Sequence, residues 1–135
     1  MKFLPCVIIA TLLPGLAAAS ETQDNMKAFV VTEVRQTLAD PMVIAAIQGS
    51  NTLNMAKSSD EILALDGKWR AEVGKDSALI GGISQNSTSA MLRDIVGASG
   101  GKITEVILMD AKGLNVAVSD VTSDFWQGDE EKHQM

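Results

Sequence analysis

Apolar side chains recur at helical spacing in the first part of the chain. Beyond residue 20, one face collects Met26, Val30 and Val34, and Phe29 and Leu38 lie beside that face. Side chains three, four or seven positions apart share a face of an α-helix, which has about 3.6 residues per turn. The spacing therefore predicts an amphipathic helix of about five turns.

A second, shorter helix is expected after this one. Asp40 is a favourable N-cap residue, and Pro41 suits the first helical position, where its missing N–H costs nothing. We predict a helix over residues 41–47. The Gly-Ser-Asn sequence at 49–51 is expected to end it.

The next helical pattern begins at Ser59, an expected N-cap that two acidic residues follow in the first turn. Ile62, Leu65 and Trp69 line one face, and Gly74 is expected to stop the helix. The i, i+4 spacing of acidic and basic side chains on this helix also predicts an Asp66–Arg70 ion pair. Trp69 and this pair are interpreted as structural.

Residues 78–98 are again helical in pattern, with apolar residues on one face. The middle of this stretch is weak, because two glycines and the polar run at 84–89 lower helix propensity. A break is therefore predicted there.

The last third of the chain reads as a β-hairpin. Residues 103–109 are rich in β-branched and apolar residues, 110–113 supply a turn with Gly113 where a positive φ is needed, and 114–119 alternate apolar with polar side chains. Because both faces of the first strand are apolar, it is expected in the interior of a sheet.

Helices first and strands last predict an α+β fold, with a helical layer packed on an antiparallel sheet. Two strands alone are marginally stable, so something must complete the sheet. Two explanations stay open: the sequence is C-terminally truncated, which the helix-like residues at 130–135 favour, or its strand edge pairs with another chain.

The hairpin and the residues after it resemble PDC/Cache-type (PAS-like) periplasmic sensor domains. The positions that carry this resemblance are Asp110, Gly113, Leu114, Asn115, Ser119, Asp120, Asp124 and Trp126. The resemblance implies extracytoplasmic sensing or binding of a small molecule, and no catalysis. A complete fold of this type has further antiparallel strands, which this sequence lacks.

The first residues indicate export. A lysine, a short apolar run and a small-residue A-x-A site are typical of a Sec signal peptide, here residues 1–19. An uncleaved membrane anchor is the alternative, although the apolar run is shorter than the roughly 20 residues of a membrane span. Cleavage would remove Cys6, the only cysteine, and leave one periplasmic domain over 20–135, with a helical part at 20–98 and the hairpin segment at 103–135.

Charge narrows the choice of partners. The formal net charge is −6, and Lys and Arg are not clustered, so nucleic acid is not an expected partner. A small molecule is expected, together with a receptor or a second copy that would pair through a strand edge. A membrane is expected to matter only if the signal peptide stays attached.

Three residues after the hairpin are the candidate ligand-binding site: Asp120, Asp124 and Trp126. The indole would give shape, and the carboxylates would orient a cationic or hydroxylated ligand. In the alternative interpretation Trp126 fills the core, and Asp124 forms a capping box with Gln127 at the start of a short helix.

No catalytic, metal or cofactor site is predicted. The acidic residues near the C-terminus lack the spacing of a calcium loop. The only histidine, His133, is the third residue from the end, so a Ser-His-Asp triad is not expected. The sequence thus favours a sensor or binding protein over an enzyme. An interaction protein that pairs through its strand edge, and a fragment without function, remain as alternatives.

Overall fold

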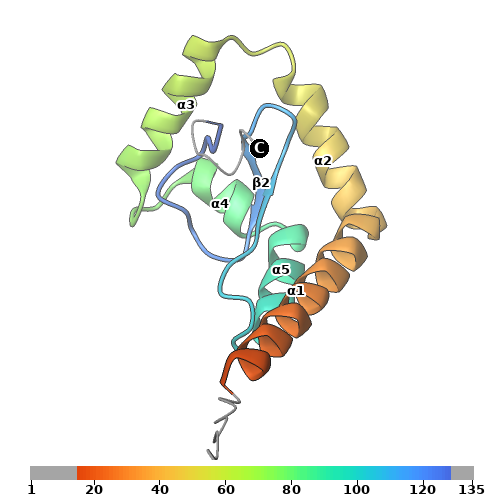
Figure 1. The fold of residues 1–135 in the computed structure, drawn as a ribbon. Coiled ribbons are helices and arrows are strands. Elements are labelled where there is room, and N and C mark those ends of the chain that lie inside the picture. Colours follow the sequence, from red (N-terminus) through yellow and green to blue (C-terminus); the bar gives the residue numbers. More distant parts are fainter. Residues whose placement is uncertain (1–14, 129–135) are drawn as a thin grey trace, which may run out of the picture.

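A computed structural model describes residues 15–128 of the chain (Figure 1). The elements, in chain order, are α1 (Gly15–Ala39), α2 (Pro41–Asn54), α3 (Ser59–Glu72), α4 (Ala78–Ser84), α5 (Ser87–Ala98), β1 (Ile107–Met109) and β2 (Asn115–Val118). The two strands pair in an antiparallel sheet. The described chain therefore mixes helices with an antiparallel sheet, as predicted.

The helices surround the hairpin. In Figure 1, α2 and α3 stand on opposite sides of it, and α1 continues into α2 at a bend. Helices α2, α4 and α5 all contact β2. Three helices therefore pack against β2, which lies at the centre of the fold.

Local signals explain most helix starts. Asp40 caps α2 by accepting a hydrogen bond from the Met42 N–H at 2.8 Å. The N-cap of α3 is Ser58, one residue before the predicted Ser59, and it forms a capping box with Glu61. At the other end of α3, Gly74 has a φ of 77°, which glycine adopts without strain, and the helix stops as predicted.

The predicted break in the helical pattern at 78–98 is confirmed. Helix α4 ends at Ser84, and α5 begins at Ser87 after its N-cap, Asn86. The Asn86 side chain accepts the Ser89 N–H at 2.8 Å, which gives the second helix its own start.

The predicted end of the second helix is wrong. Helix α2 runs through Gly49 to Asn54 rather than stopping near residue 47. Ser50, Asn51 and Asn54 favour loops in isolation, but here their side chains bond the hairpin turn from within the helix. Tertiary contacts therefore override the weak local propensity.

The predicted amphipathic face of α1 is only partly covered. Met26, Val30 and Val34 are 40%, 38% and 49% exposed. Val34 nevertheless lines a cavity together with Leu92 and Leu108. The helical periodicity is confirmed, but the apolar stripe packs loosely against the rest of the described chain.

The hairpin has the predicted turn and shorter strands. Gly113 has a φ of 79°, and its N–H bonds the Asp110 carbonyl at 3.0 Å. The register pairs Leu108 with Ala117 and then shifts before Met109. Within residues 15–128 the predicted interior position of the first strand is wrong: β1 pairs there only with β2, whose four residues are all buried.

The second edge of β2 is closed by the chain itself. The Asn115 N–H bonds the Phe125 carbonyl at 3.0 Å, and the Gln127 N–H bonds the Gly113 carbonyl at 2.8 Å. The residues after the hairpin therefore run extended beside β2, and the capping box expected at Asp124 is wrong. Further along, the Asn86 and Ser89 side chains bond the β2 backbone.

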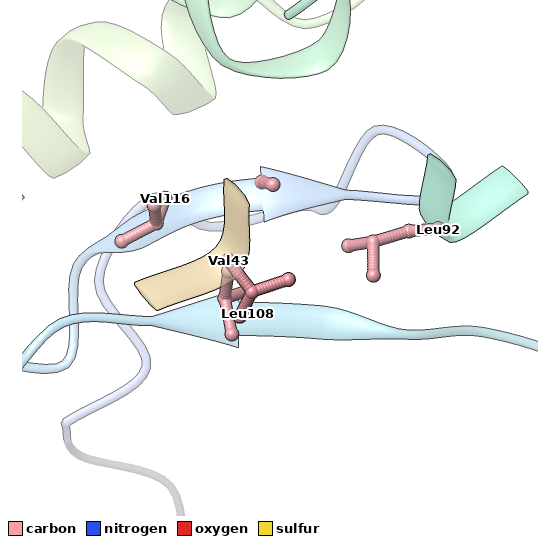
Figure 2. Packing of buried hydrophobic residues seen from close by; sticks show 5 residues of the cluster. Val43, Leu92, Leu108 and Val116 are labelled. Atoms are coloured by element: carbon pink, nitrogen blue, oxygen red, sulfur yellow. The ribbon is translucent and has the colours of Figure 1, made fainter. Parts of the chain in front are cut away.

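Two clusters form the core. The first joins α2, α5 and both strands through Val43, Leu92, Leu108, Val116 and Ala117 (Figure 2). The second lies towards α3 and contains Ile62, Trp69, Ile80, Leu114 and Phe125. In this second cluster the rings of Trp69 and Phe125 stack at 5.3 Å between centroids and 17° between planes. Residues of the hairpin thus belong to both clusters.

Candidate functional site

One buried carboxylate fastens the hairpin turn to α2. Asp110 is 4% exposed, and its Oδ2 accepts hydrogen bonds from Ser50 Oγ and Asn54 Nδ2, both at 2.8 Å. Its Oδ1 accepts the backbone N–H groups of Lys112 at 2.9 Å and Leu114 at 3.1 Å. We call this group the turn anchor. All of its donors are neutral.

A second buried carboxylate fastens the residues after the hairpin to α3. Asp66 is 4% exposed, and its Oδ1 accepts the N–H groups of Phe125 at 2.8 Å and Trp126 at 3.0 Å. Its Oδ2 pairs with Arg70 at 2.8 Å, which confirms the predicted ion pair. Arg70 also reaches Asp124 at 2.6 Å. We call this group the α3 anchor.

Both indoles reinforce the attachment of this segment. The fully buried Trp69 donates its Nε1–H to the Thr122 carbonyl at 2.8 Å. Trp126 donates its Nε1–H to the Lys112 carbonyl at 2.9 Å. The two indoles therefore bond the loop after the hairpin and the hairpin turn.

A groove of about 730 Å³ lies among α2, α4 and the sheet. Its lining is mostly apolar and comes from α2, α3, α4, the start of α5, β2 and Phe125. The lining residues are Met42, Ala45, Ala46, Gly49, Ser50, Leu53, Asn54, Lys57, Leu65, Leu79, Ile83, Asn86, Ser87, Thr88, Asn115, Val116 and Phe125. Its volume falls in the range of small-molecule sites, about 300–1,000 Å³.

The anchors set the shape of this groove. Ser50 and Asn54 line it and also bond Asp110, so the wall formed by α2 is tied to the hairpin turn. Phe125 lines it, and its N–H bonds Asp66 of α3. Opposite walls are thereby held at fixed positions on the hairpin, as a preformed ligand site requires.

The three candidate residues from the sequence do not line this groove. Asp120 is exposed, and its carboxylate accepts the N–H of the next residue at 2.8 Å. Asp124 is paired with Arg70, and Trp126 is half-buried against the second core cluster. Their neighbour Phe125 does reach the groove wall. The three residues therefore remain a prediction, at a place separate from the groove.

Few charges face the groove. Among the described residues, Lys57 is the only charged one that lines it. Nearby, hydrogen bonds from the Ser58 backbone N–H and then the Ser58 hydroxyl lower the pKa of Glu61 below its ordinary value, with a smaller contribution from the Lys57 charge. Among residues 15–128, no group of three or more potential metal-ligating side chains lies close enough to hold a metal ion. The acidic residues at 129–131 and His133 lie outside the described residues.

Comparison with known proteins gave no match: no known family, no curated protein and no solved structure matches this chain. No helix within the described part is long and apolar enough to cross a membrane. The predicted signal peptide lies largely at 1–14, outside the described residues.

Sequence reasoning missed the two buried carboxylates that hold the walls of the groove. Asp66 was read as half of a surface pair, and Asp110 as part of a turn and of the hairpin resemblance. Each is a carboxylate within or beside an apolar pattern, which is a signal for a buried, hydrogen-bonded group. Their partners are about 60 residues away, at separations of 59 and 60 for Phe125 and Ser50. No local pattern identifies partners at that distance.

Proposed function

We propose that this protein binds a small, largely apolar molecule in the groove, as an exported binding or sensor domain. The observation that carries the proposal is the groove itself, about 730 Å³ and lined by side chains from α2, α4 and the sheet. The resemblance of the hairpin to PDC/Cache sensor domains supports the same class of function. Export rests on the signal-peptide pattern.

The connection between groove and hairpin supports a sensing role. Ligand contacts to α2 act on the turn anchor, because Ser50 belongs to both the groove and the anchor. A ligand that binds one arrangement of α2 and hairpin better than another shifts the population towards it. Binding would thus be transmitted to the sheet.

The test is thermal unfolding of the full chain with a panel of amino acids, amines and carboxylates of increasing chain length. Gly49→Leu is the variant that blocks the groove. Gly49 lines the groove, and a Cβ at this position has no heavy atom within 4 Å. The new side chain therefore enters free space, and replacing a helical glycine also favours the folded state.

Gly67→Leu is the matched control. Gly67 is exposed in α3, has equally open space and does not line the groove. We expect at least one compound to raise the Tm of the wild type and of Gly67→Leu but not of Gly49→Leu. A panel in which no compound stabilises the wild type, or in which both variants respond alike, contradicts a site in this groove.

A second candidate function is strand pairing through β1, which is favoured by one observation. Within residues 15–128, β1 pairs only with β2, so its outer edge has no strand partner there. The backbone groups of Val106 and Asp110 point towards β2, so by alternation those of Ile107 point outward. Light scattering tests this: a dimer that Ile107→Pro converts to a monomer supports pairing, and a wild-type monomer excludes self-pairing.

A further inference from the structure

Helix α5 begins at the groove with an unbonded polar side chain. Thr88 lies in the first turn of this helix, is 4% exposed and lines the groove. Its hydroxyl forms no hydrogen bond within residues 15–128. Among the side-chain polar atoms of those residues, only Asn115 Oδ1 is both fully buried and unbonded, so the Thr88 hydroxyl keeps contact with solvent. Buried polar groups normally have a partner, and the groove is where a partner for Thr88 can enter.

The same turn offers two backbone donors. The Ser89 N–H bonds the Asn86 side chain at 2.8 Å, and the Ala90 N–H bonds the Asn86 carbonyl at 3.1 Å. The N–H groups of Ser87 and Thr88 have no acceptor within the described chain. Both residues line the groove. Free N–H groups at the start of a helix, together with the positive end of the helix dipole, favour an anion.

Hydrogen bonds to the sheet and to α4 hold this turn in place. Asn86 Nδ2 donates to the Val116 carbonyl at 3.0 Å, and Ser89 Oγ donates to the Ile83 carbonyl at 2.6 Å. Val116 and Ile83 also line the groove. The donors of the turn therefore stand at fixed positions beside an apolar wall, and a ligand does not have to order them on binding.

The charges of the groove lining agree with an anion at this turn. Among the described residues, the lining contains one lysine, Lys57, and no carboxylate. Lys57 follows the C-terminal end of α2, whereas α5 packs through Leu92 on Val43, near the start of α2. An anion at the first turn of α5 is therefore met by donors without repulsion from the lining, and Lys57 marks a different part of the groove.

We propose, resting on the proposed function, that the first turn of α5 binds the carboxylate of an amphipathic ligand. The N–H groups of Ser87 and Thr88 and the Thr88 hydroxyl donate to the two carboxylate oxygens. The apolar chain of the ligand starts beside Ile83 and Val116 and continues along the groove wall. The turn thus supplies the polar contacts, and the wall supplies the apolar ones.

The experiment compares octanoate with octanamide on the full chain. The two probes have the same chain and a planar head of similar shape, but the amide is neutral and replaces one acceptor oxygen by an NH₂ donor. Calorimetry is expected to show octanoate binding about tenfold tighter, the size of one charge-assisted hydrogen bond. In NMR, the amide protons of Ser87 and Thr88 are expected to move downfield with octanoate and much less with octanamide.

Thr88→Val removes the hydroxyl and keeps the shape of the side chain. The variant is expected to keep the Tm of the wild type, because the hydroxyl bonds nothing in the described chain. It is expected to weaken octanoate about fivefold and octanamide less than about twofold, and Thr88→Ser is expected to restore octanoate binding. Thr52→Val is the control, since Thr52 is exposed in α2 and does not line the groove. It is expected to change neither affinity.

Equal affinities of the two probes with unmoved Ser87 and Thr88 amides overturn the inference, while the groove remains a binding site if Gly49→Leu still abolishes binding. A preference for octanoate that Lys57→Gln removes and Thr88→Val leaves intact also overturns it, because the carboxylate then lies at Lys57. Failure of both probes to bind overturns it as well. The proposed function is then decided separately by the wider panel on Gly49→Leu and Gly67→Leu.

Discussion

The turn anchor and the α3 anchor do the same structural task with different chemistry. Asp110 gathers four neutral donors within the hairpin turn and α2, whereas Asp66 gathers two backbone amides and one guanidinium. Arg70 also pairs with Asp124, so the α3 anchor has a second route to the same segment. The α2 wall of the groove therefore depends on the single carboxylate of Asp110. The Phe125 side depends on the network of Asp66, Arg70 and Asp124.

The largest expected effect is that of Asp110→Ala. The substitution leaves Ser50, Asn54 and two backbone N–H groups without their acceptor, in a site that is 4% exposed. We expect a loss of about 3–5 kcal/mol in the free energy of unfolding, measured by urea denaturation. Asp120→Ala is the control, since its carboxylate is exposed, and its change is expected to be below about 0.5 kcal/mol. Equal effects of the two variants contradict the turn anchor.

Asp66→Ala is expected to be less damaging. Two amides lose their acceptor, but Arg70 keeps Asp124 as a partner. The expected loss in unfolding free energy is about 2–3 kcal/mol by the same measurement. If this variant proves more destabilising than Asp110→Ala, the order of the two anchors is wrong.

Trp69→Phe removes the hydrogen bond of the indole together with part of its buried bulk. The Thr122 carbonyl loses its donor at 2.8 Å, while most of the stacking on Phe125 is retained. We expect a loss of about 1–2 kcal/mol in thermal or urea unfolding. A change within error would show that the carbonyl finds another donor at no cost.

The smallest of the stability effects belongs to Arg70→Gln. The Arg70 side chain is 53% exposed, so its pairs with Asp66 and Asp124 are screened by solvent. The expected cost is about 0.5–1 kcal/mol, and it is expected to shrink in about 1 M NaCl, whereas the cost of Asp110→Ala is expected to persist. A salt-independent cost for Arg70→Gln would contradict a screened ionic contribution to the α3 anchor.

A pH titration of Glu61 tests the capping box at the start of α3, close to the groove. The pKa of Glu61 is lowered from its ordinary 4.5 mainly by Ser58. A lowered carboxyl pKa contributes stability above the ordinary value, and this contribution is lost as the pH falls through the lowered value. Ser58→Ala keeps the backbone N–H and removes only the hydroxyl, so the pKa of Glu61 is expected to rise part of the way towards its ordinary value, as read from its carboxyl carbon by NMR. An unchanged pKa would exclude the Ser58 hydroxyl as a contributor.

The parts of the fold that sequence reasoning predicted are those set by neighbours in the chain. Asp40, Gly74 and Gly113 each mark a boundary through their own backbone or side-chain chemistry, and the break at 84–89 follows from low helix propensity. The mixed helix and sheet class followed from the order of these elements.

The rest depended on contacts between distant residues. Asn51 was taken as the end of a helix, yet its side chain bonds the Ala111 N–H 60 positions away. The apolar stripe of α1 had the right period, but no periodicity states how completely the rest of the protein covers that stripe. Thr88 entered only as part of the polar run at 84–89, because its place in the groove exists only once α5 packs against α2 and β2.

The measurement that tests the account most directly is an NMR search for contacts between methyl groups of the protein and the panel compound that raises the Tm of the wild type. The methyl groups of Leu53 on α2 and of Leu79 and Ile83 on α4 mark the two walls of the groove. We predict contacts from the ligand chain to both walls. Contacts confined to the exposed stripe of α1 at Val30 and Val34 would instead contradict the groove as the binding site.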